Sequence, residues 1–271
     1  MKKILIGLMS LMGLIGVVGC DKIDPGERLI EAGGDASDWA DGAVAYIEKY
    51  TGPLCGNCPL ADRTIENLHH TYKDRMIVVS VTSITNSQGN PYGTEPSMQL
   101  EATRPWEESY GPLALPVAYI NRGEKAYSSS MNDLGGGIEE VLKQEPTVKV
   151  SVSASIEGTT VDISTDVELM SNYADPMTLT LLITEDSLRY MQYDIPNWVP
   201  DYVHNHMLRA VVTDPWGKSL SIGTTAGSKK HDNTSYELGT LTIVPANSHV
   251  VALVCDASTH RVLGCNQVDI Q

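Results

Sequence analysis

Two cysteines with two residues between them, Cys55 and Cys58, lie where a buried strand is expected to give way to a helix. Residues 44–47 upstream are apolar, and a turn that contains glycine and proline follows them. Downstream, apolar residues recur at helical spacing over 61–68. Thiols three positions apart can meet across one helical turn and close a disulfide with little movement of the chain. The pattern therefore predicts a dithiol site at a strand–helix junction.

The position of each thiol predicts its role in disulfide exchange. Cys55 falls at the expected N-cap, where free amide donors and the positive end of the helix dipole favour a thiolate. Cys58 falls on the first turn and is shielded. We therefore expect Cys55 to be the nucleophile and Cys58 to resolve the mixed disulfide. The alternative is a structural disulfide or two inert thiols, whereas a zinc site is not favoured because no second Cys or His pair is nearby.

The first 20 residues have the pattern of a lipoprotein signal peptide and are not expected to belong to the fold. Lys2 and Lys3 form a basic start, residues 4–18 are apolar apart from Gly and Ser, and small residues precede Cys20. We expect cleavage before Cys20 and acylation of this residue, which anchors the protein outside the cytoplasm. The alternative is an ordinary secretory signal with a cysteine there by chance.

The net charge of −15 excludes nucleic acid as a partner and argues against electrostatic attachment to anionic lipid. We expect membrane attachment through the N-terminal lipid, and envelope or surface proteins as partners. Neither a metal nor another cofactor is predicted. The sequence does not predict the oligomeric state.

Four segments are expected along the chain: the signal peptide 1–20, an acidic tether 21–42, an α/β domain at 43–146 and a β-domain at 147–271. The elements expected in the α/β domain are helices 58–72 and 133–144 and strands 43–49, 76–82, 117–121 and 124–129.

The β-domain is predicted from apolar and polar residues that alternate with period two over 148–156, 160–167 and 240–243. Half-buried strands joined by short turns favour an antiparallel sandwich of the immunoglobulin type. Residues 189–203 interrupt this pattern with a proline-containing excursion rich in Tyr and Trp. The excursion is expected either to form a binding surface or to cap the core of the sandwich.

The remaining cysteine pair, Cys255 and Cys265, lies on two apolar runs that form an expected hairpin. A four-residue loop at 257–260 sets Cys255 opposite Val262. A disulfide between the two cysteines would then require a bulge or a shifted register. The sequence leaves open whether the two cysteines are bonded or free.

Histidines form two further groups. His204 and His206 alternate within an expected strand, so that both face one way and could hold a metal. Because no third ligand can be assigned to them, a structural pair is favoured. His69 and His70 point to different faces of a helix, and a structural role is favoured there too.

Residues 44–130 resemble a thioredoxin-like domain. The resemblance rests on the dithiol, the strand 76–81 and Pro116, which directly precedes an apolar strand. In such proteins a cis-proline at that place packs against the dithiol and presents backbone to an extended substrate. The alternative is a trans proline that merely starts an edge strand.

The sequence departs from a working thioredoxin at several places. Leu54 replaces the usual Trp before the first cysteine, and Lys49 stands at the place of the buried relay Asp. Glu48 is adjacent, but strand alternation points it to the other face. Pro59 removes one backbone donor from the new helix. A long insertion, 83–114, is a candidate lid over the dithiol.

Three further segments carry a resemblance over nearly the full mature chain: residues 48–59, 202–209 and the closing hairpin 250–270. Through them the chain resembles an outer-membrane lipoprotein family named after a 28-kDa outer-membrane protein. The resemblance implies a lipidated envelope protein with a thioredoxin-like half and a β-sandwich half.

Two functions are compatible with these features. The leading hypothesis is thiol–disulfide exchange on envelope proteins, in which Cys55 attacks, Cys58 resolves and Pro116 presents the substrate. The alternative is a non-enzymatic surface binding, adhesion or assembly protein in which the dithiol is a structural disulfide.

Overall fold

The computed structural model describes residues 42–89, 98–111, 113–128 and 130–271. The predicted signal peptide, the lipid site Cys20 and the tether up to residue 41 lie outside the described residues. The described residues lie within one compact unit. Its described part is mainly β-structure with three α-helices.

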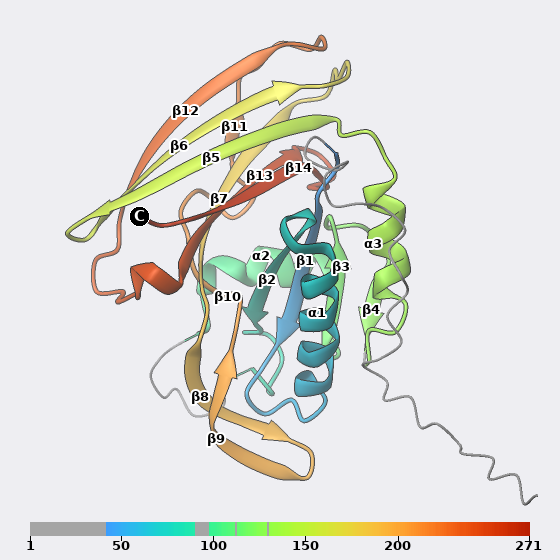
Figure 1. The fold of residues 1–271 in the computed structure, drawn as a ribbon, viewed down its shortest axis with the longest axis vertical. Coiled ribbons are helices and arrows are strands. Elements are labelled where there is room, and N and C mark those ends of the chain that lie inside the picture. Colours follow the sequence, from blue (N-terminus) through green and yellow to red (C-terminus); the bar gives the residue numbers. More distant parts are fainter. Residues whose placement is uncertain (1–41, 90–97, 112, 129) are drawn as a thin grey trace, which may run out of the picture. The chain divides into compact units, whose positions relative to one another are not determined.

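The first half of this unit is built around a buried strand, β1, that pairs in parallel with β2 and antiparallel with β3, which in turn pairs with β4 (Figure 1). All seven residues of β1 and of β2 are buried, as expected for strands covered on both faces. The elements are β1 (Ala45–Thr51), β2 (Met76–Thr82), β3 (Val117–Ile120), β4 (Ala126–Ser128), α1 (Cys58–Tyr72), α2 (Arg104–Tyr110), α3 (Leu134–Leu142) and the short 3₁₀ helices Lys73–Arg75 and Glu101–Thr103.

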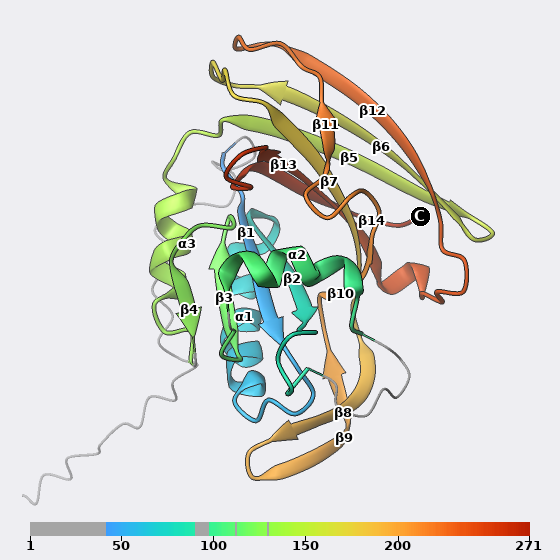
Figure 2. The ribbon, with the colours of Figure 1, turned by 180° about the vertical axis from the view of Figure 1, so that it is seen from behind.

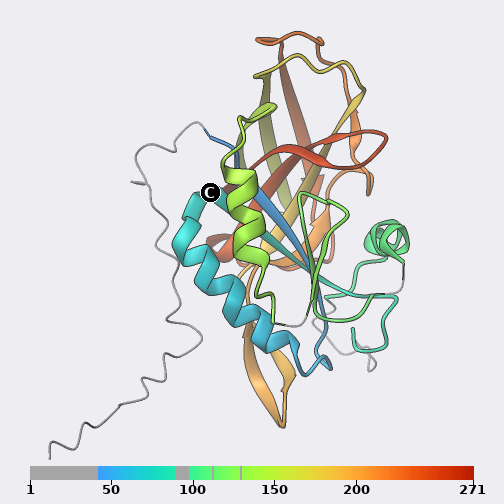
Figure 3. The same cartoon turned by 90° about the vertical axis from the view of Figure 1, so that its right-hand side faces the viewer.

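Helices cover both faces of these strands. Helices α1 and α3 lie on one face, where Ile65 and Ile138 share a core cluster with Ile47 of β1. Helix α2 lies on the other face, where Trp106 joins a cluster with Tyr46 and Tyr50. Figure 3 shows α1 (cyan) and α3 (yellow-green) on one side of the strands and α2 (green) on the other.

The same sheet continues into the second half of the chain. Strand β10 pairs with β2 through Met207 and Ser80, and β7, β13 and β14 follow, with β11 paired at the side of β7. A separate three-stranded antiparallel sheet consists of β5, β6 and β12. The bounds are β5 (Val148–Glu157), β6 (Thr160–Leu169), β7 (Met177–Glu185), β10 (Met207–Val211), β11 (Lys218–Leu220), β12 (Lys229–Glu237), β13 (Ser248–Asp256) and β14 (Val262–Asp269), with a 3₁₀ helix at Pro245–Asn247.

Apolar side chains fill the space between the three-stranded sheet and β7, β13 and β14. Val161, Ile163 and Val167 of β6 share one cluster with Leu181 of β7 and Ala252 of β13. Along β6 buried residues alternate with more exposed ones, which confirms the alternation predicted for this segment.

Residues 240–243, which show the same alternation, form no strand. Ile243 is nevertheless 9 % exposed and packs into the core cluster. The predicted strand is therefore wrong, because an irregular segment buries the apolar side chain here.

Residues 189–203, expected as a proline-containing excursion, form most of a two-stranded hairpin of β8 (Leu188–Asp194) and β9 (Asn197–His204). The turn between its strands contains a cis Ile195–Pro196 peptide bond. The hairpin forms a sheet of its own, visible beside the end of β1 and the start of α1 in Figures 1 and 2.

Candidate functional site

Cys55 and Cys58 form a disulfide, with their Cα atoms 5.4 Å apart. Cys58 is the first residue of α1, and Cys55 lies in the preceding turn. The predicted strand–helix junction is therefore present. Cys55 is only 1 % exposed and Cys58 is fully buried. A buried disulfide of this kind is shielded from an attacking thiolate.

The β8–β9 hairpin covers the dithiol loop. The backbone amide of Tyr193 donates to the carbonyl of Pro53 at 2.8 Å. The side chain of Gln192, which is 1 % exposed, donates from Nε2 to the carbonyl of Cys55 at 3.0 Å. These contacts attach the hairpin to the segment that carries the first cysteine.

A second set of contacts attaches the hairpin to α1. The hydroxyl of Tyr202 donates to Oδ2 of Asp62 at 2.9 Å. The other carboxylate oxygen of Asp62 pairs with Nζ of Lys49, which is 5 % exposed. Burial, followed by the negative charge of Asp62, raises the pKa of Tyr202, so the hydroxyl stays protonated and continues to donate.

Pro116 lies beside the dithiol loop by strand register. Val117, the first residue of β3, pairs with Tyr50, so Pro116 directly precedes β3 next to the end of β1 from which the loop leaves. The Leu115–Pro116 peptide bond is cis.

Glu48 points to the face opposite α1, as strand alternation predicts. Its carboxylate accepts from Nε of Arg122 at 2.8 Å and from the hydroxyls of Tyr46 and Tyr50. Arg122 also lies over the Trp106 ring, with 4.6 Å from its guanidinium carbon to the ring centre. This polar cluster is buried on the α2 side of the sheet.

The insertion 83–114 was a candidate lid, and its described residues divide between two places. The carbonyl of Gln88 accepts from the amide of Leu54, so one part contacts the dithiol loop. Trp106 instead donates from its ring nitrogen to the carbonyl of Pro215 at 2.7 Å on the other face. The hairpin β8–β9, rather than α2, therefore covers the disulfide.

Cys255 and Cys265 form no disulfide with each other; both are buried free thiols. Cys255 pairs with Val262 across the hairpin, as the four-residue loop predicts, and Cys265 pairs with Leu253. Burial raises the pKa of Cys255 to about 11 and that of Cys265 further, so neither is a reactive thiolate. The bond considered from the sequence is therefore not formed.

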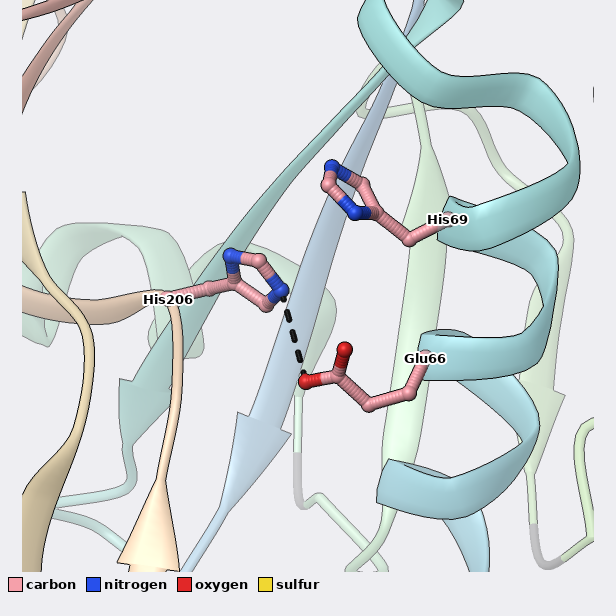
Figure 4. A group of neighbouring side chains, drawn as sticks. All are labelled: Glu66, His69 and His206. Atoms are coloured by element: carbon pink, nitrogen blue, oxygen red, sulfur yellow. Dashed lines mark ion pairs between the residues drawn. The ribbon is translucent and has the colours of Figure 1, made fainter.

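His204 and His206 do not share one face of a strand. Strand β9 ends at His204, and His206 follows in the link to β10 with a φ of 58°. The left-handed turn directs His206 toward α1, where it meets Glu66 and His69 (Figure 4). His204 and His206 therefore do not form the metal-binding pair considered from the sequence, and His206 belongs to a different group of side chains.

Sequence reasoning missed the association of Glu66 and His69 with His206. The available signal was the spacing of Glu66 and His69, which places them one turn apart on the same face of a helix. Interaction with His206, and to a smaller extent with Asn205, lowers the pKa of Glu66 to about 2. Burial lowers the pKa of His69. The third member could not be found, because it comes from a segment more than 130 residues away.

Among the described residues, no helix is long and apolar enough to cross a membrane.

Comparisons with known proteins identify the family and the fold. A family model described as outer membrane protein Omp28 matches residues 104–271, which begin after the dithiol. No match is found among curated proteins. Among solved structures, HBP35 of Porphyromonas gingivalis has a TM-score of 0.65 at 15% identity, covering 84% of this chain and 76% of that chain.

A protein of Agrobacterium tumefaciens has a TM-score of 0.53 at 14% identity and covers 86% of this chain and 97% of that chain. A domain of the outer membrane lipoprotein Omp28 from Porphyromonas gingivalis is 19% identical, with a TM-score of 0.34, over 46% of this chain and 89% of that chain. The first two likenesses show a shared fold. The family match covers more than half of the chain, which therefore belongs to the Omp28 family of outer-membrane lipoproteins of the cell envelope.

Proposed function

We propose that the protein is a non-enzymatic binding or assembly protein of the envelope in which Cys55–Cys58 is a structural disulfide. The observation that carries the proposal is the burial of Cys55 to 1 % exposure under the β8–β9 hairpin. Disulfide exchange requires a thiolate to approach one sulfur along the S–S bond. Such an approach requires displacement of a hairpin held by Gln192, Tyr193 and Tyr202.

The proposed architecture is a thioredoxin-like half followed by an immunoglobulin-like sandwich, with the boundary near residue 147. The order of β1, α1, β2, β3, β4 and α3 supports the first part. Two packed antiparallel layers support the second part. Lipid attachment at Cys20 is proposed as the membrane anchor, and envelope or surface proteins as the partners.

Exposed apolar side chains on the hairpin support a binding role. Ile195 is 56 % exposed, Trp198 is 50 % exposed and Val203 is 40 % exposed. Large apolar side chains that gather on one protruding element favour contact with another protein. The hairpin would then both cover the disulfide and offer these exposed side chains to a partner.

An insulin-reduction assay tests the structural role of the disulfide. The full chain, purified in detergent, is compared with its Cys55→Ser variant in the presence of a small thiol reductant. We expect equal rates, because the native sulfurs are inaccessible. A faster rate for the wild-type chain would overturn the proposal.

A second candidate function is disulfide exchange after the hairpin has moved. It is favoured by the position of Cys58 at the first residue of α1 and by the cis-proline Pro116, which directly precedes β3 near the end of β1. If this function is correct, the double variant Gln192→Ala/Tyr202→Phe, which lacks two of the hydrogen bonds that attach the hairpin, should reduce insulin faster than the wild-type chain. Addition of Cys55→Ser to that variant should abolish the increase, and no increase would exclude this candidate.

A further inference from the structure

Three side chains with metal-binding atoms converge between α1 and the link that joins β9 to β10. Glu66 and His69 lie one turn apart on α1, and His206 reaches them from the link (Figure 4). One ligand atom from each residue lies within 4.8 Å of the others. The rings of His69 and His206 have their centres 5.0 Å apart.

His206 is held in place, and one of its ring nitrogens faces Glu66 without forming a hydrogen bond. Its side chain is 10 % exposed, and Nε2 is buried without a hydrogen-bond partner among the described residues. Glu66 Oε1 lies 3.5 Å from this nitrogen, which is too long for a good hydrogen bond. A buried polar atom without a partner is costly, so the nitrogen points to a ligand that completes the site.

The backbone of His206 is fixed on both sides. Its amide donates to Oδ1 of Asp186 at 2.5 Å, and its carbonyl accepts from the amide of Ser80 at 2.7 Å. Its φ of 58° lies in the left-handed region, where non-glycine residues are held only by their surroundings. These contacts aim the ring at Glu66 and His69.

Neighbouring polar groups support two of the three side chains, His206 and Glu66, as they do in metal sites. Asp186 Oδ1 lies 3.4 Å from Nδ1 of His206, and Asp186 Oδ2 is 3.1 Å from Nε2 of His249. On the other side, Nδ2 of Asn205 donates to Oε1 of Glu66 at 3.0 Å. A carboxylate behind a histidine ring fixes its orientation and increases its basicity toward a metal.

We propose that Glu66, His69 and His206 bind a divalent transition-metal ion, of which Zn²⁺ is the first example. Two imidazoles and one carboxylate are a ligand set for Zn²⁺ with a fourth position left open. Mg²⁺ and Ca²⁺ prefer oxygen ligands and fit this set poorly. Ligands bound tetrahedrally at zinc distances are about 3.4 Å apart, close to the 3.5 Å between Glu66 and His206.

An ion can reach the group from solvent. A cavity of about 300 Å³ is lined by Glu66 and His206 but not by His69, so an ion would enter from the side of these two residues. Water in this cavity can supply the fourth ligand. A bound ion would join α1 to the base of the β8–β9 hairpin, because His206 follows β9 by two residues.

Zinc titration of the full chain in detergent tests the proposal. The protein is stripped with a chelator, kept oxidised so that Cys55 and Cys58 stay bonded, and titrated with Zn²⁺ in a calorimeter. We expect one Zn²⁺ per chain. His69→Gln and His206→Asn should each weaken binding by at least about tenfold, and Asp186→Asn by about 10–100-fold. Asn suits position 206 because it tolerates positive φ.

His70→Gln is the matched control, because His70 follows His69 on the same helix and lines the cavity but does not belong to the group of three ligands. It should leave the dissociation constant unchanged. Co²⁺ should give visible absorption bands of a four-coordinate ion, which disappear in His206→Asn. The proposal is overturned if the wild-type chain binds no Zn²⁺, or if binding is the same in His69→Gln and His70→Gln, which would leave Glu66 and His206 as an ion pair only.

Discussion

At the scale of single residues, Gly56 shows how closely the hairpin approaches the dithiol. A Cβ atom at this position would lie 2.3 Å from Cγ1 of Ile195 and 2.9 Å from Cδ1 of Tyr193. The amide of Ile195 also lies 3.4 Å from the carbonyl of Gly56. Gly56, the first of the two residues between the cysteines, is therefore packed closely against the hairpin, and a side chain there must displace the side chains of Ile195 and Tyr193.

Gly56→Ala should accordingly destabilise the protein and expose the disulfide. Overpacking of this kind costs about 1–3 kcal/mol in the free energy of unfolding. The rate at which a small thiol reduces Cys55–Cys58 in the native protein should rise. Both are measured on the full chain, by urea unfolding and by alkylation of the released thiols.

Gly136→Ala is the control for this change, because a Cβ atom on Gly136 meets nothing within 4 Å. Within α3 this substitution should increase stability by about 0.5–1 kcal/mol and leave the reduction rate unchanged. An unaltered reduction rate in Gly56→Ala would contradict the cover assigned to the hairpin.

At the scale of elements, the turn between β13 and β14 is organised by one carboxylate. Asp256 Oδ1 accepts from the amides of Ser258 at 2.9 Å and Thr259 at 2.7 Å. Oδ2 accepts from the hydroxyl of Tyr173 at 2.6 Å. These hydrogen bonds, of which the one from Tyr173 contributes most, hold the pKa of Asp256 well below its ordinary value. The turn therefore depends on an ionised side chain.

Asp256→Asn should lower the free energy of unfolding by about 1 kcal/mol at neutral pH, since one charged acceptor is lost. The pKa of Asp256 is lower in the folded than in the unfolded protein. The ionised side chain therefore contributes its full stabilisation above the unfolded pKa of about 3.9 and loses it as the pH falls toward the folded-state pKa. The difference between wild-type and variant should therefore shrink below about pH 4. Urea unfolding from pH 7 to pH 3 measures it, and a constant difference would be contrary to this account.

Some elements could be predicted from the sequence because their patterns are local. Helix α1 (58–72) and strand β2 (76–82) have the predicted bounds, since helical spacing and a continuous apolar run mark them clearly. Strands β8 and β9 were missed because few of their residues are buried on either face, so no alternation marks them. The cover of the dithiol and the position of His206 depend on contacts between distant segments, which spacing does not reveal.

At the scale of the whole compact unit, one buried ion pair lies where the two halves of the chain meet. The side chains of Glu48 and Arg122 are 0 % and 1 % exposed. The Arg122 guanidinium lies over Trp106 and also over Trp216 of the second half, 5.4 Å from its ring centre. The carbonyl of Asn121 accepts from the amide of Val262 in β14. These contacts predict that the two halves unfold together.

Arg122→Ala should reduce stability by about 3–5 kcal/mol, because it leaves the Glu48 carboxylate buried without its cation. Arg104→Ala is the control, since Arg104 pairs with Glu101 in an exposed position and its loss should leave stability nearly unchanged. Thermal unfolding followed by two probes, one in each half, checks both points. Similar losses of stability in the two variants, or separate unfolding transitions of the two halves in the wild-type chain, would contradict the prediction that this buried ion pair helps the two halves to unfold together.

The central claim is that the Cys55–Cys58 disulfide is structural because the β8–β9 hairpin covers it. The most direct test is the reduction potential of this bond, measured by equilibration of the full chain in thiol–disulfide buffers. A structural bond is expected below about −300 mV. A value between about −120 and about −270 mV, the range of exchange catalysts, would contradict the claim.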